Sequence, residues 1–84
     1  MVFLAITRSG YATYLALGGE AGALWVGAGV LSDVELAELR QLEVDVSNFD
    51  YEILPHEFDV IAGAVETIKE HHPGEPVWVD GKPV

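Results

Sequence analysis

Apolar segments alternate with helix-like stretches along the whole chain. Short apolar runs cover residues 2–6, 23–26 and 77–79, and a longer segment of alternating apolar and polar residues covers 44–53. This pattern predicts strands that alternate with helices and pair mostly in parallel. We therefore expect one small α/β domain over residues 1–84, in β-α-β-α-β-α-β order, with a mostly parallel sheet of four strands. The pattern leaves the order of the strands open.

The first apolar run, residues 2–6, has no polar interruption. Such a run is typical of a strand that is buried on both faces, so we expect it in the centre of the sheet. A helix over residues 10–17 should follow, with Thr7 or Ser9 as its cap. Gly18 and Gly19 then end this helix.

The other two predicted helices have clear start signals. Ser32 and Glu35 form a capping box, in which each side chain accepts a hydrogen bond from the other residue's backbone amide, and this helix runs to about Leu42. The third helix begins at Pro55, and Gly63 in its interior suggests close packing on the sheet. Its apolar face recurs at three- and four-residue spacing. The residues of that face are Phe58, Ile61, Ala62, Val65 and Ile68.

The third apolar segment changes phase within its length. Val44 and Val46 alternate in one phase, whereas Phe49, Tyr51 and Ile53 alternate in the opposite one. One regular strand cannot bury both sets on one face, because its side chains alternate with a period of two. Either a bulge near residues 47–48 or a tight turn that makes two strands accounts for the change. The interleaved polar residues predict an edge position or an antiparallel pair.

The chain is strongly acidic. Fourteen Asp and Glu residues stand against four Lys and Arg residues, for a formal net charge of −10. Phosphate-rich partners require a basic surface, so we expect binding neither to nucleic acid nor to an anionic membrane. A basic protein partner or a cation is compatible with this charge.

Cysteine is absent, which excludes disulfides, thiolate metal sites and a cysteine nucleophile. No apolar stretch approaches the roughly 20 residues that cross a bilayer. The first apolar run also lacks the preceding basic region of a signal peptide. These features together predict a cytoplasmic protein.

No side-chain pattern matches a catalytic, metal or cofactor motif. His71 and His72 are adjacent, so on a helix they point about 100° apart, and His56 lies about 24 Å away along the same helix. Nothing in the sequence marks one carboxylate as desolvated for acid–base work. We therefore expect no catalytic residue, no metal site and no cofactor.

Two junctions offer candidate ligand-binding residues. The segment after the first strand combines hydroxyls, a guanidinium and helix N-terminal amides, which together can hold a phosphate or carboxylate. The turn after the second strand has a Gly-x-Gly sequence but lacks the third glycine of a dinucleotide-binding motif. Parallel strands would bring both junctions to the same edge of the sheet. The candidates are Thr7, Arg8, Ser9 and Gly10, with Gly27 and Gly29.

Two aromatic residues are candidates for an interface. Phe49 and Tyr51 lie on the segment that we expect to be half exposed, and aromatic side chains are common at protein interfaces. An edge strand also presents unpaired backbone groups that can pair with a second copy. We therefore expect a homodimer or another protein contact there.

Two functions follow from these observations. The first is a non-enzymatic interaction or regulatory module that acts as an oligomer or with a protein partner. The alternative is a protein that binds a small anion, phosphate or carboxylate, around Arg8, Ser9 and Gly10 at the ends of the strands. The sequence alone names no ligand, partner or pathway.

Overall fold

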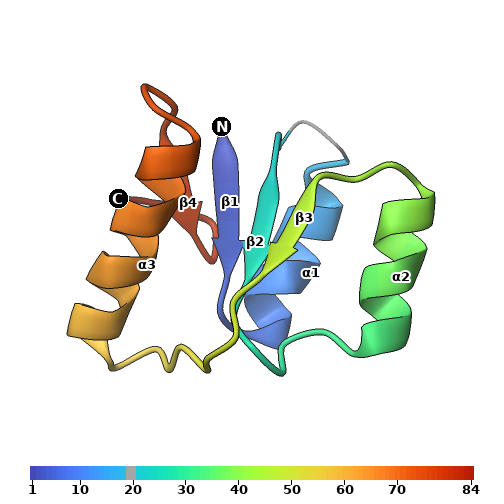
Figure 1. The fold of residues 1–84 in the computed structure, drawn as a ribbon, viewed down its shortest axis with the longest axis horizontal. Helices are drawn as coiled ribbons and strands as arrows, with labels where there is room; N and C mark the ends of the chain where they lie inside the picture. Colours follow the sequence, from blue (N-terminus) through green and yellow to red (C-terminus); the bar gives the residue numbers. More distant parts are fainter. Residues whose placement is uncertain (19–20) are drawn as a thin grey trace.

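The computed structural model, described here for residues 1–18 and 21–84, is an α/β fold with a sheet of five strands (Figure 1). The strand order is β3-β2-β1-β4-β5, and the first four strands in this order are parallel. The predicted fold class and element order are confirmed. The strands are β1 (Val2–Ala5), β2 (Leu24–Val26), β3 (Val46–Asn48), β4 (Val77–Val79) and β5 (Lys82–Pro83).

The fifth strand is an addition to the four that the sequence predicts. β5 pairs antiparallel with β4, with Val79 opposite Lys82. Asp80 and Gly81 form the turn between them, and both have positive φ, 50° and 95°. Because Gly adopts positive φ without steric cost, a tight turn forms there and the chain end returns along β4.

β1 is the central strand, as its unbroken apolar run predicts. Phe3 pairs with Leu24 of β2 on one side and with Trp78 of β4 on the other. Every residue of β1 is fully buried. A strand with neighbours on both sides and helices on both faces has no contact with water, so only apolar side chains fit there.

Two helices cover one face of the sheet and one helix covers the other, so the domain has three layers (Figure 1). Phe3 and Ala5 point toward the face covered by α1 and α2, whereas Val2 and Leu4 point toward α3. This alternation follows from the period of two along a strand. The helices are α1 (Arg8–Ala16), α2 (Asp33–Gln41) and α3 (Phe58–His71).

The starts of α1 and α2 follow local capping chemistry. Thr7 caps α1, because its hydroxyl accepts a hydrogen bond from the amide of Gly10 at 2.9 Å, and the helix therefore begins earlier than predicted. The capping box of Ser32 and Glu35 is confirmed. Gly18, with φ of 61°, follows α1, while Gly19, the other predicted stop residue, lies outside the described residues.

The phase change after β3 has a simpler cause than a bulge or a second strand. β3 ends at Asn48, and the chain then leaves the sheet as an irregular connection to α3. Beyond the end of β3, the amide of Phe49 donates to the carbonyl of Val26 at 2.9 Å, and the amide of Ala28 donates to the carbonyl of Tyr51 at 3.0 Å. β3 is an edge strand, as predicted, and its pairing with β2 is parallel rather than antiparallel.

α3 begins three residues later than predicted, at Phe58, and its buried face differs at the first turn. Phe58 is 76% exposed, because the helix begins beyond the carboxyl ends of the strands (Figure 1). Ala62 and Gly63 are also exposed, and Ala64 is buried instead. Apart from its chain neighbours and the backbone of its own helix, Gly63 has no described atom within 4 Å of the position of a Cβ, so the expected close packing on the sheet is wrong.

Over the described ranges, no helix has the length and apolar character needed to cross a membrane.

Candidate functional site

The strand order places a topological switch point between β1 and β4. The chain proceeds from β1 to β2 and β3 on one side and then crosses back to place β4 on the other side of β1. In open α/β sheets, ligands bind in the crevice outside the carboxyl ends of the strands at such a point. Here the crevice lies between the start of α1 and the turn after β4.

This crevice is filled by the side chain of Asp80. Its Oδ1 accepts a hydrogen bond from the amide of Ile6 at 2.8 Å, and its Oδ2 accepts one from the hydroxyl of Thr7 at 2.8 Å. The amide of Asp80 donates to the carbonyl of Leu4 at 2.8 Å. Gly10 leaves room for the carboxylate, because a Cβ at Gly10 would overlap it. A carboxylate of the chain itself therefore lies at the N-terminus of α1.

Asp80 is not among the candidate site residues that the sequence predicts. Its contact with Ile6 spans 74 positions along the chain, and it depends on β4 lying beside β1. The local signal, an Asp before a Gly after the last strand, predicts the turn and not the contact. Only the strand order brings this side chain to the candidate residues Thr7 and Gly10.

Arg8 is directed toward α2. Its Nη1 donates to both carboxylate oxygens of Glu35 at 2.9 Å and to the carbonyl of Val30 at 3.0 Å. The pKa of Glu35 is lowered, first by the hydrogen bond from the backbone amide of Ser32 and second by the hydrogen bond from Arg8. The guanidinium also lies 5.6 Å from the ring centroid of Tyr11. Arg8 thus ties the start of α1 to the start of α2.

The buried phenols beside this ion pair stay protonated at neutral pH. Burial raises the pKa of Tyr11, and the negative charge of Glu35 raises it further. Burial also raises the pKa of Tyr14, whose ring lies 6.1 Å from that of Tyr11. These two side chains pack in the core between the sheet and α1, and neither is poised as a proton-transfer group.

An open cavity of about 220 Å³ lies beside the Arg8 junction. It brings Thr7 and Arg8 together with Gly29, so it joins the two junctions that the sequence singles out. Glu52 also lines the cavity, which therefore combines one guanidinium with one carboxylate. The remaining lining residues are Ile6, Ala28, Val30, Ile53 and Leu54.

The other candidate residues of the two junctions lie outside this cavity. Gly10 is buried against Asp80, and Gly27 is buried with the backbone of Ile53 only 3.5 Å from the position of a Cβ. Ser9 is exposed, with its hydroxyl 3.3 Å from that of Thr7. Of the six candidates, Thr7, Arg8 and Gly29 therefore line the cavity, and Gly10 and Gly27 are buried. Ser9 is exposed near the start of α1.

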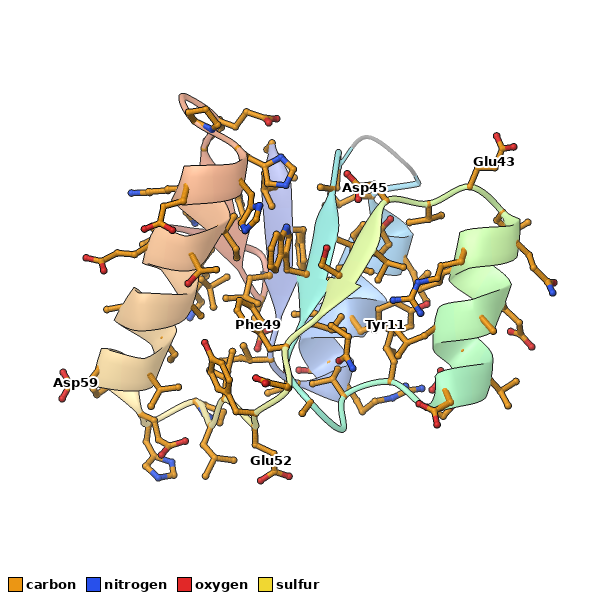
Figure 2. All side chains as sticks on the ribbon, viewed as in Figure 1. Tyr11, Glu43, Asp45, Phe49, Glu52 and Asp59 are labelled. Carbon is orange, nitrogen blue, oxygen red and sulfur yellow. The ribbon has the colours of Figure 1, made fainter. Side chains whose placement is uncertain are left out.

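The two aromatic interface candidates have different surroundings. Phe49 is only 7% exposed, and its ring lies 5.2 Å from that of Trp25 between the sheet and α3 (Figure 2). The expectation that Phe49 is partly exposed is wrong, because the chain turns off the sheet after Asn48 and carries this side chain into the core. Tyr51 is 40% exposed, and its ring lies 5.2 Å from that of Phe49.

Tyr51 is one of three exposed apolar residues close together in the sequence, of which Tyr51 and Leu54 lie on the connection between β3 and α3 and Phe58 is the first residue of α3. Leu54 is 42% exposed and Phe58 is 76% exposed. The amide of Glu57 donates to the carbonyl of Leu54 at 3.0 Å, and the amide of Leu54 donates to the carboxylate of Glu57 at 3.2 Å, so a turn holds this segment. We call the group formed by Tyr51, Leu54 and Phe58 the 51–58 surface.

Acidic side chains flank the 51–58 surface. Asp50, Glu52 and Asp59 are exposed, and Glu57 is half-buried. Figure 2 shows the side chains of Glu52 and Asp59 directed outward at the end of the molecule where β3 connects to α3. A hollow of about 330 Å³ adjoins Phe58, and residues 56–60 line it. Sequence reasoning missed Leu54 and placed Phe58 on the buried face.

Two of the three histidines lie at the end of α3 away from this surface. The indole Nε1 of Trp25 donates to Nε2 of His72 at 3.3 Å, and Nδ1 of His72 lies 3.3 Å from the carboxylate of Glu75. The ring of His71 lies 5.4 Å from that of Trp25. Within the described ranges, His, Asp and Glu side chains form no group of three or more that could hold a metal ion.

Comparisons with protein-family models, with curated proteins and with solved structures give no significant match for this chain. The geometry and charge of the residues themselves are therefore the basis for a functional proposal.

Proposed function

We propose that this protein is a non-enzymatic interaction module that binds another protein chain through the 51–58 surface. The observation that carries the proposal is the exposure of Tyr51 and Leu54 on the connection after β3 and of Phe58 at the start of α3. Single exposed apolar residues are ordinary on a protein surface, whereas a rimmed group of them marks an interaction site. Aromatic side chains are also enriched at such interfaces.

Binding of a small anion around Arg8, Ser9 and Gly10 has less support. The carboxylate of Asp80 lies at the N-terminus of α1, where an added anion would meet its negative charge. Arg8 already donates to Glu35. A melting temperature that rises with millimolar phosphate in the parent protein, and does not rise in Arg8→Ala, would favour this alternative.

The chemistry of the partner is a separate question from the location of the surface. β3 is an edge strand, which supports the expected homodimer. Two copies would bring together chains that each carry a net charge of −10, which opposes self-association at low ionic strength. We therefore propose a different chain as the principal partner. Light scattering over a range of protein concentrations measures the homodimer separately.

The acidic charge also motivates the proposal that nucleic acid is not a partner. The cytoplasmic location stays a prediction, and cell fractionation with an antibody to the natural protein tests it.

Substitution of exposed side chains tests the proposed surface. The double variant Leu54→Ser with Phe58→Ser removes two apolar groups, and Leu42→Ser is the matched control because Leu42 is 75% exposed at the end of α2. Proteins that bind the immobilised parent chain are identified and purified. Each is then titrated against the parent chain, the double variant and Leu42→Ser. Circular dichroism checks that all three forms are folded.

We expect the double variant to lose at least tenfold in affinity for such a partner, on the order of 1.4 kcal/mol. Leu42→Ser should bind as the parent chain does. Equal affinity of the parent chain and the double variant for every purified partner would overturn the proposal. Concentration-dependent dimers that the double variant abolishes would assign the surface to self-association instead.

A further inference from the structure

We infer that the partner of the 51–58 surface presents a cationic amphipathic segment, with apolar side chains set between Lys or Arg residues. This inference rests on the proposed function and adds the chemistry of the partner. It follows from the distribution of charge around the three exposed apolar side chains, which differs from that of the rest of the chain.

Basic residues are absent from the middle of the sequence. Between Arg40 and Lys69 there are seven Asp and Glu residues and no Lys or Arg. The 51–58 surface lies within this region. Its only other ionisable side chain of basic character is His56, which lines the hollow beside Phe58. Arg8, which lines the cavity beside Leu54 and Glu52, donates to Glu35, so a partner that approaches the 51–58 surface meets mainly carboxylates.

In the sequence, an acidic residue comes directly before and directly after each exposed aromatic residue. Asp50 and Glu52 flank Tyr51, and Glu57 and Asp59 flank Phe58. Over the described part of the chain, the ion pairs join Arg8 to Glu35 and His72 to Glu75, so none of these four flanking acids is in an ion pair. A surface with apolar side chains among unpaired carboxylates is complementary to a partner with apolar side chains among cations.

Arginine is well suited to both parts of this pattern. Its guanidinium pairs with carboxylates through a planar fork and also stacks on aromatic faces, which Tyr51 and Phe58 expose. The hollow of about 330 Å³ beside Phe58 provides space for an apolar side chain of the same segment. Glu57 and Asp59 also line this hollow. A cationic side chain next to the apolar one can therefore contact a carboxylate.

The other occupants of an apolar surface fit this charge less well. A second copy of the chain would set one acidic rim against another, and a phosphate-rich partner would meet the same repulsion. A cationic partner is instead attracted over roughly one Debye length, about 10 Å at 0.1 M salt, and its association should be faster at low salt.

Two synthetic peptides test the inference. The first is a helix former of roughly 15 residues, long enough to form a helix on contact, with Leu and Phe on one face and Lys and Arg on the other. The second keeps the same apolar positions and replaces every Lys and Arg with Glu. Each is labelled and titrated by fluorescence anisotropy with the full chain, in about 20 mM and about 200 mM salt.

Three variants separate local recognition from general attraction to an acidic protein. Glu52→Gln with Asp59→Asn removes two charges from the rim. Glu38→Gln with Glu70→Gln removes two charges from exposed positions on α2 and α3, and is the matched control. Leu54→Ser with Phe58→Ser removes the apolar anchors.

We expect the basic peptide to bind the parent chain, with affinity that falls as salt rises, and the acidic peptide not to bind. The rim variant should lose about fivefold in affinity and the control less than twofold, because only the rim charges lie beside the bound segment. No binding of the basic peptide, or equal losses in the rim variant and its control, would overturn the inference.

The failure of the inference and the failure of the proposed function give different results. If the Leu54 and Phe58 variant loses binding to both peptides alike, while the rim variant binds as the parent does, the surface is an interaction site and its charge preference is wrong. If the Leu54 and Phe58 variant binds every peptide as the parent does, the 51–58 surface itself is wrong, and the proposed function fails with it.

Discussion

The carboxylate of Asp80 lies in the space left by the missing side chain of Gly10. The two residues are 70 positions apart in the sequence, and they meet because β4 lies beside β1. Asp80 also accepts hydrogen bonds from the amide of Ile6 and the hydroxyl of Thr7. These bonds link the turn after β4 to the start of α1. The crevice at the switch point of the sheet is closed by this contact.

A methyl group at position 10 should destabilise the fold. Because the Cβ of Gly10→Ala would overlap the Asp80 carboxylate, we expect a loss of about 1–3 kcal/mol in the free energy of unfolding. Gly63→Ala is the matched control in an exposed, unobstructed position of α3, and it should gain up to about 1 kcal/mol from helix propensity. Urea denaturation measures both, and losses of similar size in the two variants would contradict the contact.

The Asp80 carboxylate itself should contribute more than a turn residue normally does. In Asp80→Ala the amide of Ile6 and the hydroxyl of Thr7 lose their acceptor, which should cost about 2–4 kcal/mol. Asp80→Asn keeps one acceptor oxygen and tolerates the φ of 50°, so its loss should be about half as large. Urea denaturation of both variants measures this difference.

A double variant separates the two roles of Asp80. Once Asp80→Ala has removed the carboxylate, Gly10→Ala should cost much less than it does in the parent chain, because the overlap is gone. Costs that simply add would show that Gly10 is needed for another reason.

The ion pair between Arg8 and Glu35 should contribute a pH-dependent part of the stability. The pKa of Glu35 is lowered below its ordinary value of 4.5 in the folded chain. The ionised carboxylate therefore stabilises the fold above that pH, and the stabilisation is lost as the pH falls through the lower, folded value. The melting temperatures of the parent and Glu35→Gln should differ at about pH 7 and converge toward about pH 3.

Glu38→Gln is the control for this titration. It removes the same charge from α2 without the contacts of Glu35 to Ser32 and Arg8. A difference between the parent and Glu35→Gln that stays constant over the whole pH range would show that the carboxylate charge is not the source of the stabilisation.

Salt should stabilise the protein. Its net charge of −10 makes the folded chain repel itself, and ions screen this repulsion. We expect the melting temperature to rise between about 20 mM and about 300 mM sodium chloride. The variant Glu52→Gln with Asp59→Asn, which carries two fewer charges, should show a smaller rise. A melting temperature that stays flat or falls would contradict the argument.

Much of the fold can be predicted from local pattern. The unbroken run of β1, the capping box of Ser32 and Glu35 and the spacing of Val65 and Ile68 each depend on residues within a few positions of one another. The first turn of α3 could not be predicted in this way. Phe58 has the correct spacing for the buried face, but the sheet does not extend far enough to cover it.

The candidate site shows the same division. The sequence placed Arg8 and Gly29 at the same edge of the sheet, and both line one cavity. It gave no indication that Asp80 would lie against Gly10 or that Glu35 would accept from Arg8. Both contacts join segments far apart in the chain, so they depend on which strands and helices become neighbours.

By itself, the sequence therefore determined the fold class, the order of elements, the buried central strand and the acidic charge. These properties depend on composition and on periods of two and 3.6 residues, which are present in any short window of the chain. The tertiary structure alone decided that Asp80 closes the crevice, that Phe49 is buried, and that Tyr51, Leu54 and Phe58 remain exposed. Each of these outcomes depends on where a strand ends and which element covers it, and no local period contains that information.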